Sequence, residues 1–211
     1  MTSPQLFWDQ GTAYDLFVSL QVLHDPSSFG VRGAWAAGVR ARVPASEREA
    51  LEQVQSMVHV PLHWVYSLPE PRDAATALWA LEQLAPIERL LALYLSLERA
   101  PGGAEAILRE VARRGSWGEA DREALLSTYE DLDPCMEGKA PPSSGKLGEV
   151  LDWWTGAEEL GERYLAAIRA YHEVFFAEEE RRIRPALQKA LSRAQERAER
   201  MPLLDLLEEL S

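Results

Sequence analysis

The feature that most constrains this fold is a long stretch of helical periodicity, from Lys146 to Arg200. Apolar residues recur there every three or four positions, which is the period of a helix with one buried face. They are Leu147, Val150, Leu151, Trp154, Leu160, Tyr164, Leu165, Ile168, Tyr171, Phe175, Phe176, Ile183, Leu187 and Leu191. At a rise of about 1.5 Å per residue, a helix of about 50 residues would extend about 75 Å. This length indicates a spine or a dimer strut against which the other helices pack.

The first predicted interruption of this stretch lies near residue 156. Thr155 to Glu158 has the capping-box pattern, in which a hydroxyl and a carboxylate satisfy each other's free amides. Gly156 and Gly161 weaken a helix locally. We therefore expect a short helix over 146–154 and a new start near 156.

Prolines predict two further features of the C-terminal part. Pro185 lacks an amide hydrogen, and its ring clashes with the carbonyl four residues back, which predicts a kink near 181–185. Pro202 suits the first turn of a helix and predicts a short final helix over 202–210. The expected C-terminal element is thus one long, Pro-kinked helix.

The first 130 residues predict several shorter helices, most of them opened by a capping pattern or a first-turn proline. The expected ranges are 12–24, 30–42, 46–58, 73–84, 86–98, 103–114 and 116–130, with caps at Thr12, Ser46, Asp73 and Ser116. Residues 59–72 contain three prolines and predict a connection, with a short extended piece where apolar residues alternate over 60–66. The chain is therefore predicted to be all-α, a bundle of about 8–10 helices.

Residues 131–146 form the best linker candidate, because Pro, Gly and Ser concentrate there. The segment either separates 1–130 from 147–211 or is a surface loop of one helical domain over 1–211. We favour the loop, since the aromatic face of the long helix needs a partner that only the earlier helices supply.

Composition excludes several classes of protein. The formal net charge is −12, from 34 acidic and 22 basic residues. A surface this acidic repels phosphate backbones, which argues against a chain that binds DNA or RNA by itself. Cys135 is the only cysteine, which fits a reducing cytoplasm, and no stretch is apolar enough to predict a signal peptide or a membrane span. Nearly all basic residues are Arg, which points to a GC-rich genome and is compatible with a thermophile.

An aromatic stripe on the long helix is the first candidate site. Core packing is the interpretation that we favour, and the alternative is a pocket for a small apolar ligand between helices. The candidate pocket residues are Trp153, Trp154, Tyr164, Tyr171, His172 and Phe175.

Metal binding has little support in the sequence. His59 and His63 have the four-residue spacing of zinc ligands, but Pro61 lies between them and argues against a regular helix. A carboxylate-bridged site needs repeated Glu-x-x-His pairs, whereas Arg169 stands three residues before His172. We therefore predict no metal and no cofactor, and we expect polar loop histidines and a solvated, ion-paired helix face.

Enzymatic activity also lacks a signature, and none is predicted. Arg32, Arg40, Arg42 and Arg48 form the most basic local patch, which we expect to be exposed or ion-paired rather than a phosphate clamp. Cys135 lies among acidic residues that raise the pKa of a thiol, so it is a poor nucleophile. The chain has no phosphate-cradling loop, no Gly-x-Ser-x-Gly elbow and no Cys-x-x-Cys pair.

Two segments resemble the N-terminal region of a group of bacterial ArsR-type transcriptional regulators. They are Tyr14 to Pro26 (YDLFVSLQVLHDP), followed by Trp35, and Tyr171 to Glu180 (YHEVFFAEEE), followed by Ile183, Pro185 and Leu187. In that group a long helical region precedes a C-terminal winged helix that binds DNA. The sequence printed here ends at Ser211 without a winged helix or a basic recognition helix, so DNA would be reached only through a winged helix absent from this chain.

The resemblance implies a cytoplasmic regulatory and dimerisation module, expected as a homodimer, of a transcriptional regulator. Because the Cys-rich motif of the metal sensors is absent, an organic ligand or a protein partner is expected rather than a metal ion. Two alternatives stay open: a helical small-molecule-binding protein or enzyme with a pocket along 153–176, and a stand-alone protein-interaction bundle.

Overall fold

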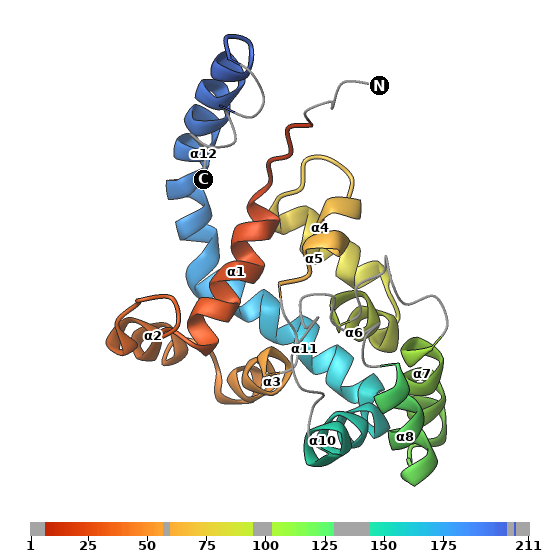
Figure 1. Cartoon of the computed structure of the whole chain (residues 1–211). Coiled ribbons are helices and arrows are strands. Elements are labelled where there is room, and N and C mark those ends of the chain that lie inside the picture. The colour runs from red at the N-terminus through yellow and green to blue at the C-terminus, as the bar shows by residue number, and fades with distance from the viewer. Residues whose placement is uncertain (1–6, 57–59, 95–102, 129–143, 202–204, 206–211) are drawn as a thin grey trace, which may run out of the picture.

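The computed structural model describes residues 7–56, 60–94, 103–128, 144–201 and 205. This part of the chain consists of helices with short connections and contains no strand (Figure 1), so the all-α prediction is confirmed. The helices are α1 (Thr12–His24), α2 (Gly33–Arg40), α3 (Ala45–Gln55), α4 (Leu62–Ser67), α5 (Ala74–Gln83), α6 (Pro86–Tyr94), α7 (Ala104–Arg114), α8 (Glu119–Ser127), α10 (Ser144–Thr155), α11 (Ala157–Tyr171), the π-helix η2 (His172–Phe176) and α12 (Ala177–Ala198).

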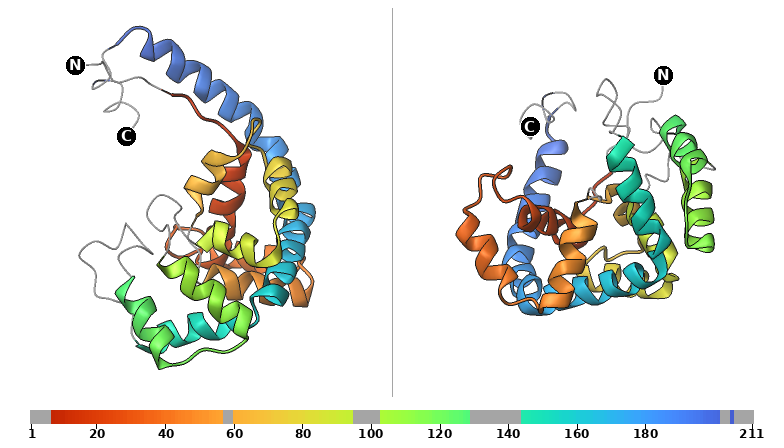
Figure 2. Two further views of the ribbon diagram at one scale, coloured as in Figure 1. Left: turned by 90° about the vertical axis from the view of Figure 1, so that its right-hand side faces the viewer. Right: turned by 90° about the horizontal axis from the view of Figure 1, so that it is seen from below.

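The long C-terminal helix is present as predicted. The segments α11, η2 and α12 follow one another without a gap and together cover 42 residues. In the middle of the molecule, α11 packs against α3, α5 and α6. Beyond η2, α12 runs on past the body (Figures 1 and 2).

The buried face of α11 follows from its sequence period. Leu160, Tyr164, Ile168 and Tyr171 are at most 5% exposed. Gly161 lies against α6, where an added Cβ would stand 2.2 Å from the carbonyl oxygen of Pro86. The residue that we expected only to weaken the helix is therefore the point of closest approach between α11 and α6.

The helix changes direction where α11 passes through η2 into α12 (Figure 1). A π-helical turn breaks the regular hydrogen-bonding ladder and is a recognised cause of bends. Pro185, where the sequence predicted a kink, lies inside α12 and does not end it. The irregular backbone thus begins thirteen residues before that proline, at His172.

One predicted side-chain cap is confirmed, because the Asp73 carboxylate accepts a hydrogen bond from the Thr76 amide at 2.9 Å. The other predicted caps are wrong. Their helices begin after Gly11, Pro44, Gly118 and Gly156, which supply no capping side chain. The hydroxyl of Thr155 donates instead to the Asp152 carbonyl at 2.6 Å, inside the end of α10. A hydroxyl that already has a partner in the preceding turn does not cap the next helix.

The predicted connection over 59–72 is wrong in its middle, where residues 62–67 form α4. Pro61 stands just before this helix, a position at which its missing amide costs nothing. Trp64 is buried, and its ring meets that of Phe17 on α1 edge to face at 5.8 Å. Burial of this tryptophan outweighs the extended pattern that the local alternation suggested.

A single core cluster joins the described helices other than α12, including residues on both sides of the predicted loop, such as Leu108 of α7 and Leu151 of α10. Residues 144–146 of that loop already belong to α10. The remainder of the predicted loop over 131–146 lies outside the described residues, as does almost all of the predicted final helix over 202–210.

Candidate functional site

The predicted pocket residues are core or core-edge side chains. Trp154, Tyr164 and Tyr171 are at most 3% exposed, whereas Trp153, His172 and Phe175 are partly buried. The rings contact neighbouring helices: Trp154 meets Tyr94 of α6 at 6.2 Å, and Phe175 meets Trp35 of α2 at 5.5 Å. The cavity described below is lined by other residues, so a ligand pocket along this stripe stays a prediction.

Two tyrosines of the stripe have buried polar contacts. Gln55 of α3 donates its amide to the hydroxyl of Tyr164 at 2.6 Å, and the Tyr171 hydroxyl donates to Ser19 of α1 at 2.9 Å. Burial raises the pKa of both phenols above the ordinary value. Both therefore stay neutral and act as hydrogen-bonding groups that fix α11 against α3 and α1.

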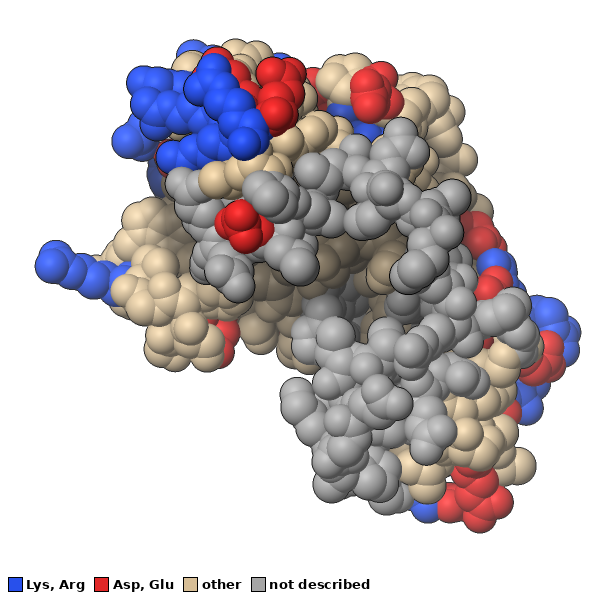
Figure 3. All heavy atoms as spheres, turned by 45° about the horizontal axis from the view of Figure 1, so that its top comes forward, with Lys and Arg blue, Asp and Glu red and all other residues tan. Residues whose placement is uncertain are grey.

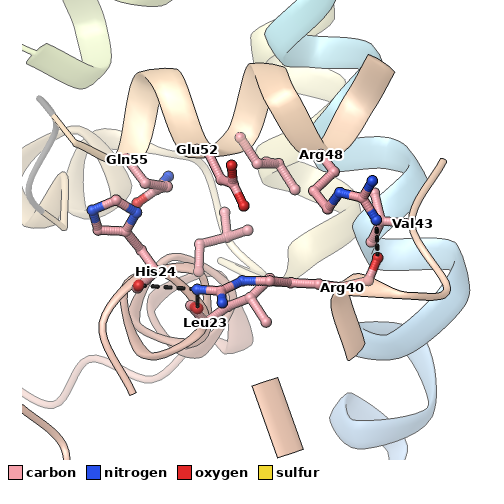
Figure 4. Close-up of a pocket in the computed structure, with 9 residues that line it drawn as sticks. Leu23, His24, Arg40, Val43, Arg48, Glu52 and Gln55 are labelled. Carbon is pink, nitrogen blue, oxygen red and sulfur yellow. Dashed lines mark hydrogen bonds between the residues drawn. The ribbon is translucent and has the colours of Figure 1, made fainter. Parts of the chain in front are cut away.

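A small cavity, whose exposed surface is almost entirely apolar, lies between the end of α1, the turn after α2 and the length of α3 (Figure 4). Counting its open mouth, it leaves about 300 Å³ free of protein atoms. Its apolar lining consists of Leu20, Leu23, Val43 and Leu51, and its polar lining of His24, Arg40, Arg48, Glu52 and Gln55. The sequence did not predict that these residues lie together, although it identified both arginines as part of a basic patch.

Main-chain carbonyls hold both cavity arginines in place. The Nη2 group of Arg40 donates to the carbonyls of Leu23 and of His24, the latter at 3.0 Å. These carbonyls stand at the end of α1, where a helix has free acceptors and partial negative charge. The Nη1 group of Arg48 donates to the Arg40 carbonyl at 3.4 Å. Figure 4 shows both contacts beside the cavity.

These two cations lack the carboxylate partners that most other arginines here have. Among the described residues, no carboxylate oxygen lies within 4.0 Å of Arg32, Arg40, Arg42 or Arg48. We expected these arginines to be exposed or ion-paired: Arg32 and Arg42 are exposed, whereas Arg40 and Arg48 are half-buried and donate to main-chain carbonyls instead. The sequence does contain a local sign that these arginines lack carboxylate partners, because no Asp or Glu occurs between Asp25 and Glu47.

A second polar cluster lies where α12 leaves the body. Glu180, which is 9% exposed, accepts hydrogen bonds from the Thr12 hydroxyl and from Arg184, the latter at 3.0 Å. Arg184 also lies 3.7 Å from a carboxylate oxygen of Asp73, the cap of α5. The cluster ties the first turns of α12 to the starts of α1 and α5.

Replacing Asp15 with asparagine is expected to stabilise the protein at neutral pH. Burial first, and then the negative charge of Glu180, raises the pKa of Asp15 above its ordinary value of 3.8. A carboxylate with a raised pKa in the folded state contributes stability below 3.8 that is lost as the pH rises through the folded value. Urea denaturation of wild type and variant should therefore differ at neutral pH and converge well below 3.8. Equal stability at neutral pH would contradict this reading of the α1–α12 contact.

The predicted histidine pair is not assembled into a metal site by the described residues. His63 is exposed on α4, and His59 lies outside the described part of the chain, as does Cys135. His172 stands with its Nε2 3.9 Å from Glu180. In the residues that the structure describes, no group of three or more His, Cys, Asp or Glu side chains could hold a metal ion.

Comparisons with known protein families, with curated proteins and with solved structures found no match. No helix in the described ranges is both long and apolar enough to cross a membrane. The site therefore has to be interpreted from its own geometry and charge.

Proposed function

We propose that the chain is a regulatory and dimerisation module of a bacterial ArsR-type transcriptional regulator. The proposal combines the sequence resemblance with one structural observation, which is the exposed course of α12. In this role the module would self-associate through α12, and DNA binding would belong to a winged helix outside this chain.

The pattern along α12 supports self-association. From Arg181 to Ala198, the half-buried side chains recur at intervals of four and three residues, and all the others are exposed. These half-buried residues are Ile183, Leu187, Leu191, Ala194 and Ala198. From Leu187 onward, the intervals of four, three and four residues match the seam of a coiled coil. The polar cluster around Glu180 anchors only the first turns, and Figure 1 shows the helix continuing away from the body.

Charge on the projecting end of α12 limits how two copies would pair. Between Lys189 and Arg200 there are four basic and two acidic side chains, in a protein of net charge −12. Figure 3 shows basic side chains gathered at this end of the molecule. Like charges at two adjacent tips repel each other, so we propose an antiparallel pair, which separates the tips.

The dimer should be visible by light scattering during size-exclusion chromatography at micromolar concentration. Replacing Leu191 with glutamate would bury a charge in the seam and is expected to weaken association by at least about 100-fold. Replacing Gln195, an exposed residue one turn further, with glutamate adds the same charge outside the seam and should leave the dimer intact. A monomeric wild-type protein at tens of micromolar would overturn the dimerisation proposal.

The regulator part of the proposal has a separate test. Sequencing the native reading frame past the codon for Ser211 should reveal a helix-turn-helix pattern with a basic face. A stop codon immediately after Ser211 would contradict the DNA-binding context. It would leave the dimer and the cavity to be explained by another class of regulatory protein.

A further inference from the structure

We infer that the outer face of α12 contacts the phosphate backbone of double-stranded DNA, without reading the base sequence. In the proposed regulator, the winged helix outside this chain would recognise the operator, and α12 would add contacts to the DNA beside it. The inference rests on the proposed function for this setting. Its test uses the present chain alone and does not depend on dimerisation.

The first step is the uneven distribution of charge along the chain. Residues 181–195 of α12 contain five basic side chains and no acidic one, in a protein of net charge −12. The remainder of the chain therefore has a formal charge more negative than −12. Figure 3 shows basic side chains gathered at the end of the molecule to which α12 runs. A polyanion would be attracted to this helix and repelled by the body.

The second step is the arrangement of basic side chains around α12 and its last turn. Four of them are exposed and are separated by seven, four and seven residues: Arg182, Lys189, Arg193 and Arg200. At 3.6 residues per turn they lie within about 40° of one another, and we call them the basic stripe. The stripe extends about 27 Å along the helix, which is the length of about eight base pairs. A straight row of cations matches a linear polyanion better than it matches a compact acidic patch on a protein.

The third step is that most of the basic stripe has no carboxylate partner. Arg182 donates to Glu179 at 3.0 Å. Lys189, Arg193 and Arg200, in contrast, have no carboxylate oxygen within 4.0 Å among the described residues. A phosphate that approaches these three side chains does not have to displace an ion pair within the protein. We therefore expect three phosphate contacts.

The fourth step is the position of the basic stripe relative to the proposed dimer seam. The stripe lies about 150° around the helix from the seam residues Leu187, Leu191, Ala194 and Ala198. Pairing of two copies through the seam would therefore leave the stripe in solvent. The stripe contains no aromatic residue, whereas proteins that bind single strands commonly stack bases on aromatic rings. Contacts of Lys and Arg with phosphates position a duplex without specifying its sequence.

The acidic body limits the affinity of this contact but does not abolish it. At about 0.1 M salt the Debye length is about 10 Å, so charges of the body that lie further from the duplex are largely screened. Phosphates in direct contact with the basic stripe are closer than this distance. Few contacts and a repelling body place the expected Kd at the weak end of non-specific binding, about 10⁻⁴ M.

Fluorescence anisotropy of a labelled DNA duplex of arbitrary sequence and about 20 base pairs, titrated with the full chain, measures the binding. We expect a Kd of about 10⁻⁴ M at about 50 mM salt, and a slope of about 3 when log Kd is plotted against log salt concentration. Arg193→Gln should weaken binding at least about threefold and reduce that slope by about 1.

Glu196 provides a variant with the opposite response. It is exposed and one turn from both Arg193 and Arg200, and it forms no ion pair with either of them. Its negative charge opposes a phosphate at the basic stripe. Glu196→Gln should therefore tighten binding about twofold. A misfolded variant could not produce this gain.

Matched controls separate the basic stripe from the net charge of the protein. Arg32 stands just before α2, away from the projecting end of α12 (Figure 1). It is exposed and also lacks an ion pair within the described part of the chain. Arg32→Gln changes the net charge by the same amount as Arg193→Gln and should leave the Kd unchanged. Poly-L-glutamate, a polyanion without phosphates, should displace the labelled duplex much less effectively than unlabelled duplex does.

Three results would overturn the inference. The first is no rise in anisotropy at about 1 mM protein, well above the expected Kd. The second is equal loss of affinity in Arg193→Gln and Arg32→Gln. The third is displacement by poly-L-glutamate as effective as by duplex, which would identify an acidic protein as the partner instead.

These results are distinguishable from a failure of the proposed function. The variants leave the seam unchanged, so light scattering should give the same mass for all of them. A monomeric protein would contradict dimerisation without altering the contact between α12 and DNA. A stop codon after Ser211 would contradict the regulator setting, and the measured Kd would stay the same.

Discussion

Replacing Gly161 with alanine is expected to lower the free energy of unfolding by about 2–3 kcal/mol. The new Cβ would stand 2.2 Å from the carbonyl oxygen of Pro86 and 2.6 Å from its carbonyl carbon. Both are backbone atoms, so the clash is relieved only if α11 and α6 move apart and loosen the core around Leu160 and Leu90. Alanine favours a helix over glycine by about 1 kcal/mol, which offsets only part of this loss.

Urea denaturation followed by circular dichroism measures the effect, and Gly38 provides the matched control. Gly38 also lies inside a helix, α2, but an added Cβ there would meet nothing within 4 Å. Gly38→Ala should therefore stabilise the protein by up to about 1 kcal/mol. A Gly161→Ala protein as stable as wild type would mean that α11 and α6 do not approach this closely in solution.

The length and position of the C-terminal helix were predictable because a helix with one buried face needs apolar residues at every third or fourth position. Leu160, Tyr164, Ile168 and Tyr171 have that period, and all of them are buried. The break before Ala157 was predictable too, since Gly156 weakens any helix. These features depend on local sequence and on one apolar face, and both are visible without knowing what packs there.

Features that depend on contacts between distant segments were not predictable. From the sequence alone, Gly161 predicts only a locally weakened helix, whereas in the fold it lies directly against Pro86. The α4 helix forms where prolines suggested a connection, because Trp64 packs on Phe17 across the chain. The π-helix η2 has no residue signature comparable to proline, so the sequence drew attention to Pro185 instead.

The candidate site likewise combines features that local sequence predicts with features that depend on contacts between distant segments. The basic character of Arg40 and Arg48 was visible, but nearby glutamates in the sequence suggested ion pairs. In the fold, Glu52 lines the same cavity as Arg48 and stands one turn further along α3, yet the two form no ion pair. The cavity itself arises where α1, α3 and the turn between α2 and α3 meet, which no local pattern records.

Replacing Tyr164 with phenylalanine is expected to destabilise the protein by about 1–2 kcal/mol, although only one oxygen is removed. The Tyr164 ring is 1% exposed, and its hydroxyl accepts a hydrogen bond at 2.6 Å from Gln55, whose side chain is 6% exposed. Without the hydroxyl, the Gln55 amide would stay buried with an unsatisfied donor. Tyr164→Ala would also remove the ring from the core, and should lower the free energy of unfolding by about 3–5 kcal/mol.

A double-mutant cycle separates the hydrogen bond from packing. Gln55→Leu removes the donor, so in a Gln55→Leu, Tyr164→Phe protein neither partner is left unsatisfied. We expect this double variant to be more stable than the sum of the two single changes predicts, by about 1 kcal/mol. Urea denaturation of the four proteins gives the coupling energy. If the two single changes in the free energy of unfolding simply add, Gln55 and Tyr164 are not energetically coupled. The hydrogen bond between α3 and α11 would then contribute nothing measurable to stability.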